Sequence, residues 1–110
     1  MKFITVPINE EALNKLMYDK ADSNELSELL LSQQEVNELF ISGFFDRLNL
    51  ILDINIDDFE DEEITDMRKL IIFKNFLQDH IKNDPQKIYQ DLYRLVSIAI
   101  EKETGIFFFF

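Results

Sequence analysis

Apolar residues recur three or four positions apart along most of this chain, and strict alternation of apolar and polar residues is nearly absent. This spacing places apolar side chains on one face of a helix, whereas a half-buried strand requires alternation. The longest stripe consists of Val36, Leu39, Phe40, Phe44, Leu48 and Ile51, and it is widened by Ile41, Phe45, Leu50 and Leu52. We therefore predict an all-α fold, a compact bundle of about five helices.

Local signals place the ends of these helices. Ser32 and Glu35 match a capping box, in which the hydroxyl and the carboxylate each accept a backbone N–H of the first turn. Asp84 followed by Pro85 predicts a junction, because Asp caps helices and Pro favours their first position. Gly43 predicts a kink or a close helix crossing. The predicted helices cover, approximately, residues 10–19, 22–30, 33–52, 60–82 and 85–104, the last ended by Gly105.

Two terminal segments depart from the helical pattern. Phe3–Val6 is strand-like in composition, and Ile106–Phe110 is one Ile followed by four Phe. Each is compatible with a short strand, and the two could pair, although a two-stranded ribbon alone is marginal. The tail has two interpretations. It folds back over a gap between helices, since burying one Phe is worth about 1.5–3 kcal/mol, or it is an exposed end that binds a partner.

Size and composition predict one globular domain spanning residues 1–110, with 46% hydrophobic residues. The chain has no cysteine, which excludes disulfides, thiolate metal sites and a cysteine nucleophile. We find no signal-peptide pattern at the N-terminus and no run of about 18 apolar residues that could span a membrane. We therefore expect a cytoplasmic protein that does not interact with membranes.

The net charge of −11 is unevenly distributed along the chain. Residues 1–66 hold 17 of the 22 acidic and 4 of the 11 basic residues, a balance of −13, whereas residues 67–110 have a balance of +2. A surface of this sign disfavours direct binding of nucleic acid, because contacts to the phosphate backbone require Lys and Arg. The acidic part instead favours a basic macromolecular partner.

One acidic run without any basic residue carries most of this charge, and three interpretations compete for it. The first is calcium binding, since Asp53, Asn55 and Asp57 match the opening of an EF-hand loop, but Asp58 and Ile64 stand where that loop needs Gly and Glu. The second is stabilisation of a following helix through its dipole, at about 0.3–1 kcal/mol for each carboxylate in the first turn. The third is a surface that binds a partner. The candidate partner-binding residues are Asp53, Asp57, Asp58, Glu60, Asp61, Glu62, Glu63 and Asp66.

No set of residues indicates catalysis, a metal site or a cofactor. The single histidine, His80, follows Phe76 and Leu77 at helical spacing, which predicts a place at the border of the core. Only two glycines are present, so loops that cradle phosphates are excluded. We therefore predict no catalytic residue, no metal, no cofactor and no enzymatic activity. A carboxylate pair doing acid–base chemistry is a further alternative, but nothing singles out a pair.

The whole-chain profile of an acidic, helical, cytosolic domain resembles bacterial toxin-immunity proteins, those of contact-dependent growth inhibition systems and of nuclease bacteriocins. This resemblance covers size, charge and helical character and includes no motif. It implies a monomer or weak homodimer that neutralises a cognate toxin domain, a nuclease and specifically a ribonuclease, by covering its basic site. Secondary candidates for partner contacts are Asp22, Glu25, Glu28, Tyr89 and Tyr93. The alternative is a small regulatory or adaptor protein that acts through its Phe-rich tail or by homodimerisation.

Overall fold

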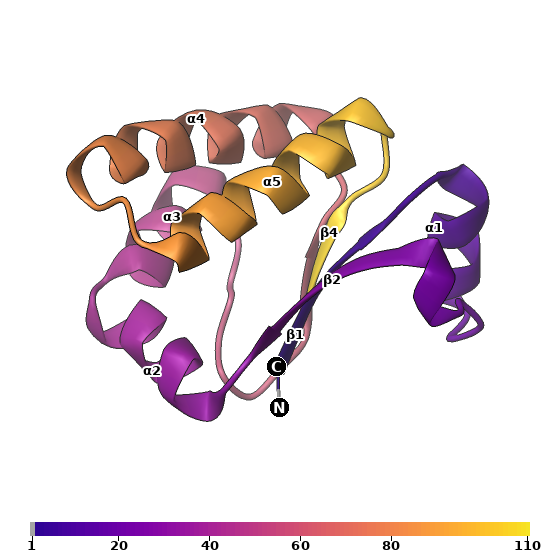
Figure 1. The fold of residues 1–110 in the computed structure, drawn as a ribbon, viewed down its shortest axis with the longest axis horizontal. Coiled ribbons are helices and arrows are strands. Elements are labelled where there is room, and N and C mark those ends of the chain that lie inside the picture. The colour runs from indigo at the N-terminus through magenta and orange to yellow at the C-terminus, as the bar shows by residue number, and fades with distance from the viewer. Residues whose placement is uncertain (1) are drawn as a thin grey trace.

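The computed structural model describes residues 2–110 and has an α+β fold (Figure 1). Helices pack on an antiparallel four-stranded sheet with the strand order β2–β1–β4–β3. The elements are β1 (Lys2–Pro7), α1 (Glu10–Met17), a 3₁₀ turn (Ser23–Glu25), β2 (Leu26–Leu31), α2 (Gln33–Ile41), α3 (Phe44–Leu52), β3 (Glu62–Ile64), α4 (Met67–Asn83), α5 (Lys87–Glu101) and β4 (Ile106–Phe109).

The sheet shows that the prediction of an all-α bundle is wrong. Residues 26–30 belong to a predicted helix, yet residues 26–31 form β2 and pair along their length with β1, with Leu31 opposite Lys2. A run of four leucines within six residues suits a helix and a strand equally well, and the neighbouring strand decides between them. The start predicted for the helix of residues 60–82 is also wrong, because Glu62–Ile64 forms β3 and pairs with β4.

The two terminal segments pair with each other, as one of the open alternatives proposed. Ile4 of β1 lies opposite Phe108 of β4, and β4 is an interior strand that lies between β1 and β3. Phe108 is fully buried. The tail is therefore part of the sheet and the core, and it is not a free end available to a partner.

Several local predictions are confirmed. The capping box of Ser32 and Glu35 is present, with the Glu35 N–H 3.1 Å from the Ser32 hydroxyl oxygen and the Ser32 N–H 3.0 Å from the Glu35 carboxylate. Gly43 has a φ of 82°, a left-handed conformation that divides the predicted helix of residues 33–52 into α2 and α3. Asp84 ends α4, but Pro85 lies in the connection and α5 begins two residues later, at Lys87.

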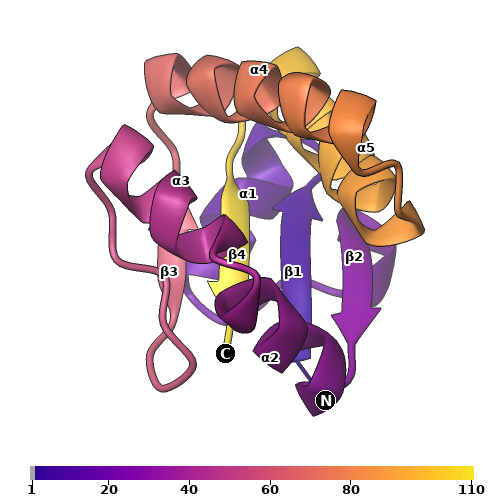
Figure 2. The ribbon, with the colours of Figure 1, turned by 90° about the vertical axis from the view of Figure 1, so that its left-hand side faces the viewer.

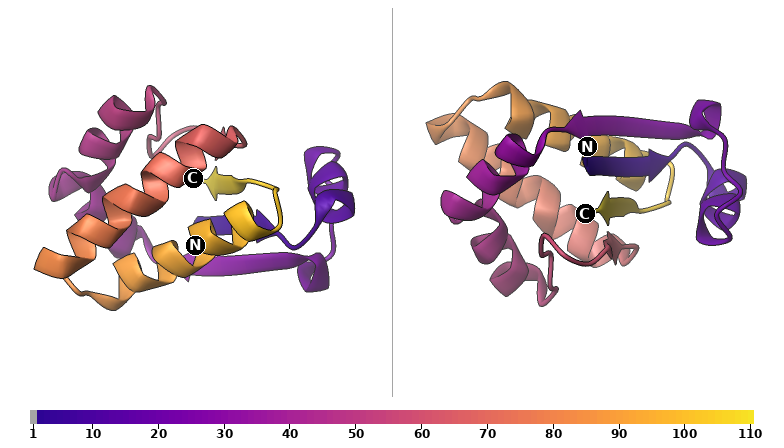
Figure 3. Two further views of the ribbon diagram at one scale, coloured as in Figure 1. Left: turned by 90° about the horizontal axis from the view of Figure 1, so that it is seen from above. Right: turned by 90° about the horizontal axis from the view of Figure 1, so that it is seen from below.

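The helices α4 and α5 lie side by side over one face of the sheet, as the view from above shows (Figure 3). Alternation along the strands directs Ile4, Val6 and Phe108 toward these helices, and all three are fully buried. The opposite face exposes parts of Phe3 and Leu30. Within residues 2–110, no helix is both long and apolar enough to cross a bilayer.

Candidate interaction surface

The side of the molecule seen in Figure 2 carries α2, α3 and the connection that leads to β3. Residues 33–66 form most of this side and contain eleven carboxylates but a single basic residue, Arg47. Lys2 of β1 also lies against this segment, beside Asp58. We call this side the acidic surface. Its carboxylates belong to Glu35, Glu38, Asp46, Asp53, Asp57, Asp58, Glu60, Asp61, Glu62, Glu63 and Asp66.

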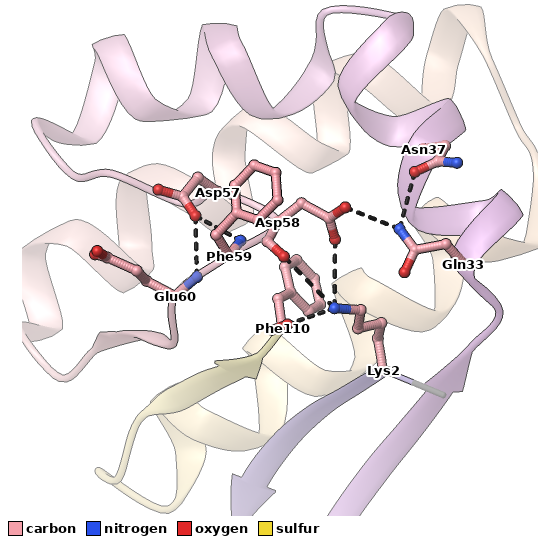
Figure 4. A network of polar contacts seen from close by, with 8 residues as sticks. All are labelled: Lys2, Gln33, Asn37, Asp57, Asp58, Phe59, Glu60 and Phe110. Carbon is pink, nitrogen blue, oxygen red and sulfur yellow. Dashed lines mark hydrogen bonds and ion pairs between the residues drawn. The ribbon is translucent and has the colours of Figure 1, made fainter.

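Some of these carboxylates hold the fold of the connection. The Oδ1 atom of Asp57 accepts backbone N–H groups from Phe59 at 2.7 Å and from Glu60 at 3.0 Å, which closes the turn shown in Figure 4. The Asp66 carboxylate accepts the N–H of Arg68 at 2.9 Å and caps α4. These groups have a structural role whether or not a partner binds.

Asp58 ties the connection to both ends of the chain (Figure 4). Its carboxylate lies 3.5 Å from the ammonium group of Lys2 and accepts a hydrogen bond from the Gln33 side chain at 2.9 Å. The same Lys2 ammonium group donates to the backbone carbonyl of Phe110. Asp58 is only partly exposed. This carboxylate therefore fixes the position of the connection more than it offers charge to a partner.

Four other carboxylates of the predicted run are exposed and unengaged. Within the described residues 2–110, the side chains of Asp53, Glu60, Asp61 and Glu63 form neither a hydrogen bond nor an ion pair with the rest of the protein. Glu62 differs, because its carboxylate accepts the Asn55 N–H at 3.0 Å. The predicted run thus contains both structural carboxylates and carboxylates whose charge is available to another molecule.

An open groove of about 460 Å³ crosses the acidic surface between α2, α3 and the connection. We call it the α2–α3 groove. Asp46, Asp57 and Asp58 border it, as do the apolar side chains of Ile41 and Phe59. An adjoining hollow shares Asp46 and Asn49 with the groove and is lined by Leu50 and Asp53 as well.

The apolar residues of this surface are not among the partner-binding residues predicted from the sequence. Ile41 and Leu50 fit the helical stripe but point to solvent, and Phe59 stands alone within the acidic run. An aromatic residue surrounded by acids is the one signal in the sequence that could have indicated them. The acidic residues of α2 and α3, including Asp46, were also missed, because they lie outside the continuous run.

The secondary candidates lie away from this surface. Asp22 precedes and Glu25 ends the 3₁₀ turn that lies beside α1, and α1 is at the opposite end of the molecule from α2 and α3 in Figure 1. The Glu25 carboxylate is 3.1 Å from the Lys15 ammonium group, and this hydrogen bond lowers the pKa of Glu25. Glu28 lies on the edge strand β2 and is exposed. These carboxylates do not extend the acidic surface.

The two tyrosines occupy different environments. Tyr89 is buried, its ring centroid lies 4.2 Å from that of His80, and burial raises the pKa of its hydroxyl. It therefore packs the core and offers no surface to a partner. Tyr93 is half-buried, and the Lys74 ammonium group lies 5.5 Å from its ring centroid, within the range of a cation–π contact. Neither tyrosine borders the α2–α3 groove.

No site for a metal ion is apparent among residues 2–110, where no three His, Asp or Glu side chains are grouped as ligands. In particular, Asp53 and Asp57 do not converge with a third carboxylate.

Comparison with known proteins gives a match in structure. No family model matches the chain, and no curated protein matches its sequence. A solved structure, that of the Neisseria DNA mimic protein DMP12, has the same fold, with a TM-score of 0.68 and 100% of both chains covered. Because the two sequences are only 16% identical, the match supports a shared α+β fold and nothing more specific.

This match overturns the prediction of a toxin-immunity protein in a contact-dependent growth inhibition or bacteriocin system, together with its nuclease-toxin partner. The resemblance to immunity proteins depended on size, charge and all-helical character, and the four-stranded sheet removes the last of these. A protein that has the same fold over its full length is named a DNA mimic. Acidity and size alone therefore did not identify the class of protein.

Proposed function

We propose that this protein is a DNA mimic: its acidic surface occupies the DNA-binding surface of a basic DNA-binding protein and competes with DNA for it. The observation that carries the proposal is the concentration of eleven carboxylates against one basic residue in the segment of residues 33–66, which forms α2, α3 and the connection to β3. The shared fold with a DNA mimic protein supports the same conclusion.

The amount of charge is suited to this role. Residues 33–66 carry a formal charge of −10. Duplex DNA carries one negative charge per about 1.7 Å of its axis, so the same charge belongs to about five base pairs over about 17 Å. The molecule measures 36 × 27 × 25 Å. Spread along a 27 Å extent, ten charges are about 2.7 Å apart, which is within about a factor of two of the spacing along duplex DNA.

The rigidity of the surface supports mimicry as well. Phosphates in a duplex are held at regular positions, and a mimic gains affinity if its carboxylates need little ordering on binding. Here the Asp57 turn, the Asp58 contacts with Lys2 and Gln33, and the Asp66 cap fix the connection in the free protein. The exposed carboxylates of Glu60 and Asp61 are thus carried on an ordered segment.

Retention on the immobilised protein tests the proposal. Proteins of a cell extract are bound to the wild-type chain and eluted either with a short duplex DNA or with polyglutamate of equal total charge. A DNA mimic retains DNA-binding proteins, and the duplex releases them at a lower charge concentration than polyglutamate does. Retained proteins that bind no DNA, or that the duplex and the polyglutamate release equally, would contradict the proposal. A chain with Glu60→Gln, Asp61→Asn and Glu63→Gln provides the charge control.

A further inference from the structure

Three large apolar side chains are almost fully exposed on the acidic surface. Phe59 is 90% exposed, Ile41 85% and Leu50 84%, which makes them the most exposed large hydrophobic side chains among residues 2–110. They gather around the α2–α3 groove and the hollow that adjoins it. Single exposed apolar residues are common, but a group rimmed by charge is typical of a binding surface.

The local fold of the free protein holds these side chains at the surface. The Asp57 carboxylate accepts the Phe59 N–H and so closes the turn on which the ring is carried. Ile41 and Leu50 lie on α2 and α3, whose separation is set by the break at Gly43. The side chain of Asn49 holds the wall of the groove through Ile56. An apolar ligand group would thus meet a preformed surface.

The charges around the groove specify what can occupy it. Asp46, Asp53 and Asp57 border the groove and the adjoining hollow, and no Lys or Arg lines either of them. An occupant must therefore supply positive charge at the rim and apolar groups at the centre. A second copy of this chain does not meet this requirement, because its net charge is −11 and its own acidic surface would repel this one.

We infer that the α2–α3 groove binds a cationic amphipathic segment of the partner. The apolar side chains of this segment, which would otherwise contact DNA, occupy the groove, and the Lys or Arg residues beside them pair with the carboxylates at its rim. DNA-binding proteins place apolar side chains against thymine methyl groups or between base steps, next to residues that contact phosphates. The carboxylates then take the place of phosphates, and Ile41, Leu50 and Phe59 take the place of the apolar parts of the bases. This inference takes the class of partner, a DNA-binding protein, from the proposed function. What it adds is the part of that partner that the groove binds.

Two synthetic helical peptides test the inference. Both have the same length and number of lysines; one carries leucines along a single face, and the other carries glutamines at those positions. We expect wild type to bind the Lys/Leu peptide at least about tenfold more tightly than the Lys/Gln peptide at about 0.15 M salt. The variant Ile41→Ser, Leu50→Ser, Phe59→Ser should lose this preference while keeping the salt dependence of binding, because its carboxylates are intact.

A matched control variant replaces exposed apolar residues elsewhere. Met17→Ser, Ile71→Ser, Ile72→Ser changes α1 and α4, which do not line the groove, and it should keep the preference for the Lys/Leu peptide. Circular dichroism establishes that both variants are folded. Equal binding of the two peptides by wild type, or a preference that survives in the groove variant, would overturn the inference.

Sedimentation of wild type alone provides a second outcome that counts against the inference. A dimer that the groove variant abolishes would show that the groove is occupied by a second copy of the chain. The elution experiment tests the proposed function separately, because its result depends on competition with DNA and not on the groove. A peptide preference located in the groove, combined with retained proteins that bind no DNA, would leave the groove as a docking site for another kind of basic protein.

Discussion

The side chain of Asn49 is hydrogen bonded to both backbone polar groups of Ile56. Its Nδ2 atom donates to the Ile56 carbonyl at 3.0 Å, and its Oδ1 atom accepts the Ile56 N–H at 2.8 Å. These two bonds attach the acidic connection to α3 and replace the strand pairing that Ile56 lacks. Ile56 itself is buried, so the paired bonds also position a core side chain.

Replacing Asn49 by Ala should therefore destabilise the protein and loosen the groove. Two partly buried backbone groups would lose their partners, at a cost of about 1–3 kcal/mol in the free energy of unfolding. Urea unfolding measures this change. Asn75→Ala on the exposed surface of α4 is the control and should change stability by less than about 0.5 kcal/mol. Equal effects of the two substitutions would show that the Asn49 bonds do not hold the connection.

Gly105 is predicted to tolerate no side chain. A Cβ atom there would lie 2.9 Å from the Ile64 carbonyl oxygen and 2.8 Å from a methyl carbon of Thr65. The carbonyl belongs to the short strand β3 and cannot move without disturbing its pairing with β4. We expect Gly105→Ala to lower the free energy of unfolding by about 1–3 kcal/mol. Unchanged thermal and urea unfolding would contradict the close approach of these strands.

Part of the fold could be predicted from local sequence. The capping box at Ser32 and the amphipathic pattern of α5 depend on neighbouring residues, so they could be recognised without the structure. The four-stranded sheet could not, because the residues of β2 and β3 fit helical patterns, and the pairing of β1 with β4 from opposite ends of the chain was only one of the alternatives. The leucines of β2 fit a helical stripe as well as a strand, and only the pairing with β1 selects the strand.

The candidate surface was predictable to a similar extent. The continuous acidic run can be recognised in the sequence by its composition. Its exposed members that form no hydrogen bond or ion pair among residues 2–110 are Asp53, Glu60, Asp61 and Glu63. Which carboxylates the fold itself uses depends on turns and caps that form only in the folded chain. The exposure of Ile41 and its proximity to Phe59 depend on how α2 packs beside the connection, so periodicity assigned Ile41 to the core stripe.

Two substitutions that remove the same charge should therefore affect stability in opposite directions. Asp61→Ala removes an exposed carboxylate that accepts no hydrogen bond among residues 2–110, and relief of repulsion should raise the free energy of unfolding by about 0.2–1 kcal/mol at low salt. Asp66→Ala removes the cap of α4 and should lower it by about 1 kcal/mol. Urea unfolding in low salt compares them. A loss of stability in both variants would assign a structural role to Asp61 as well.

His80 should make stability depend on pH. Burial against Phe44, Phe76 and Tyr89 lowers its pKa below the ordinary value, outweighing the opposite effect of Asp84 at 3.6 Å, and Arg47 also lowers it. The unfolded chain is therefore protonated at a higher pH than the folded protein. The stability that neutral His80 contributes is complete above the unfolded pKa of about 6.5 and is lost as pH falls through the folded value.

The variant His80→Gln isolates this effect, because all carboxylates are shared with wild type. Urea unfolding between about pH 8 and pH 5 should show wild type losing stability relative to the variant as the pH is lowered. A constant difference would mean that His80 titrates alike in the folded and unfolded chains. A difference of the opposite sign would mean that Asp84, and not burial, controls this histidine.

Displacement of DNA from a protein retained in the elution experiment tests the central claim most directly. The fluorescence anisotropy of a labelled duplex bound to that protein is followed as the wild-type chain is added, with the variant Asp53→Asn, Glu60→Gln, Asp61→Asn, Glu63→Gln as the control. The account predicts that wild type releases the duplex completely at a fixed stoichiometry, and that the variant requires at least about tenfold more protein at low salt. A stable complex that contains the chain, the DNA-binding protein and the duplex together would contradict DNA mimicry.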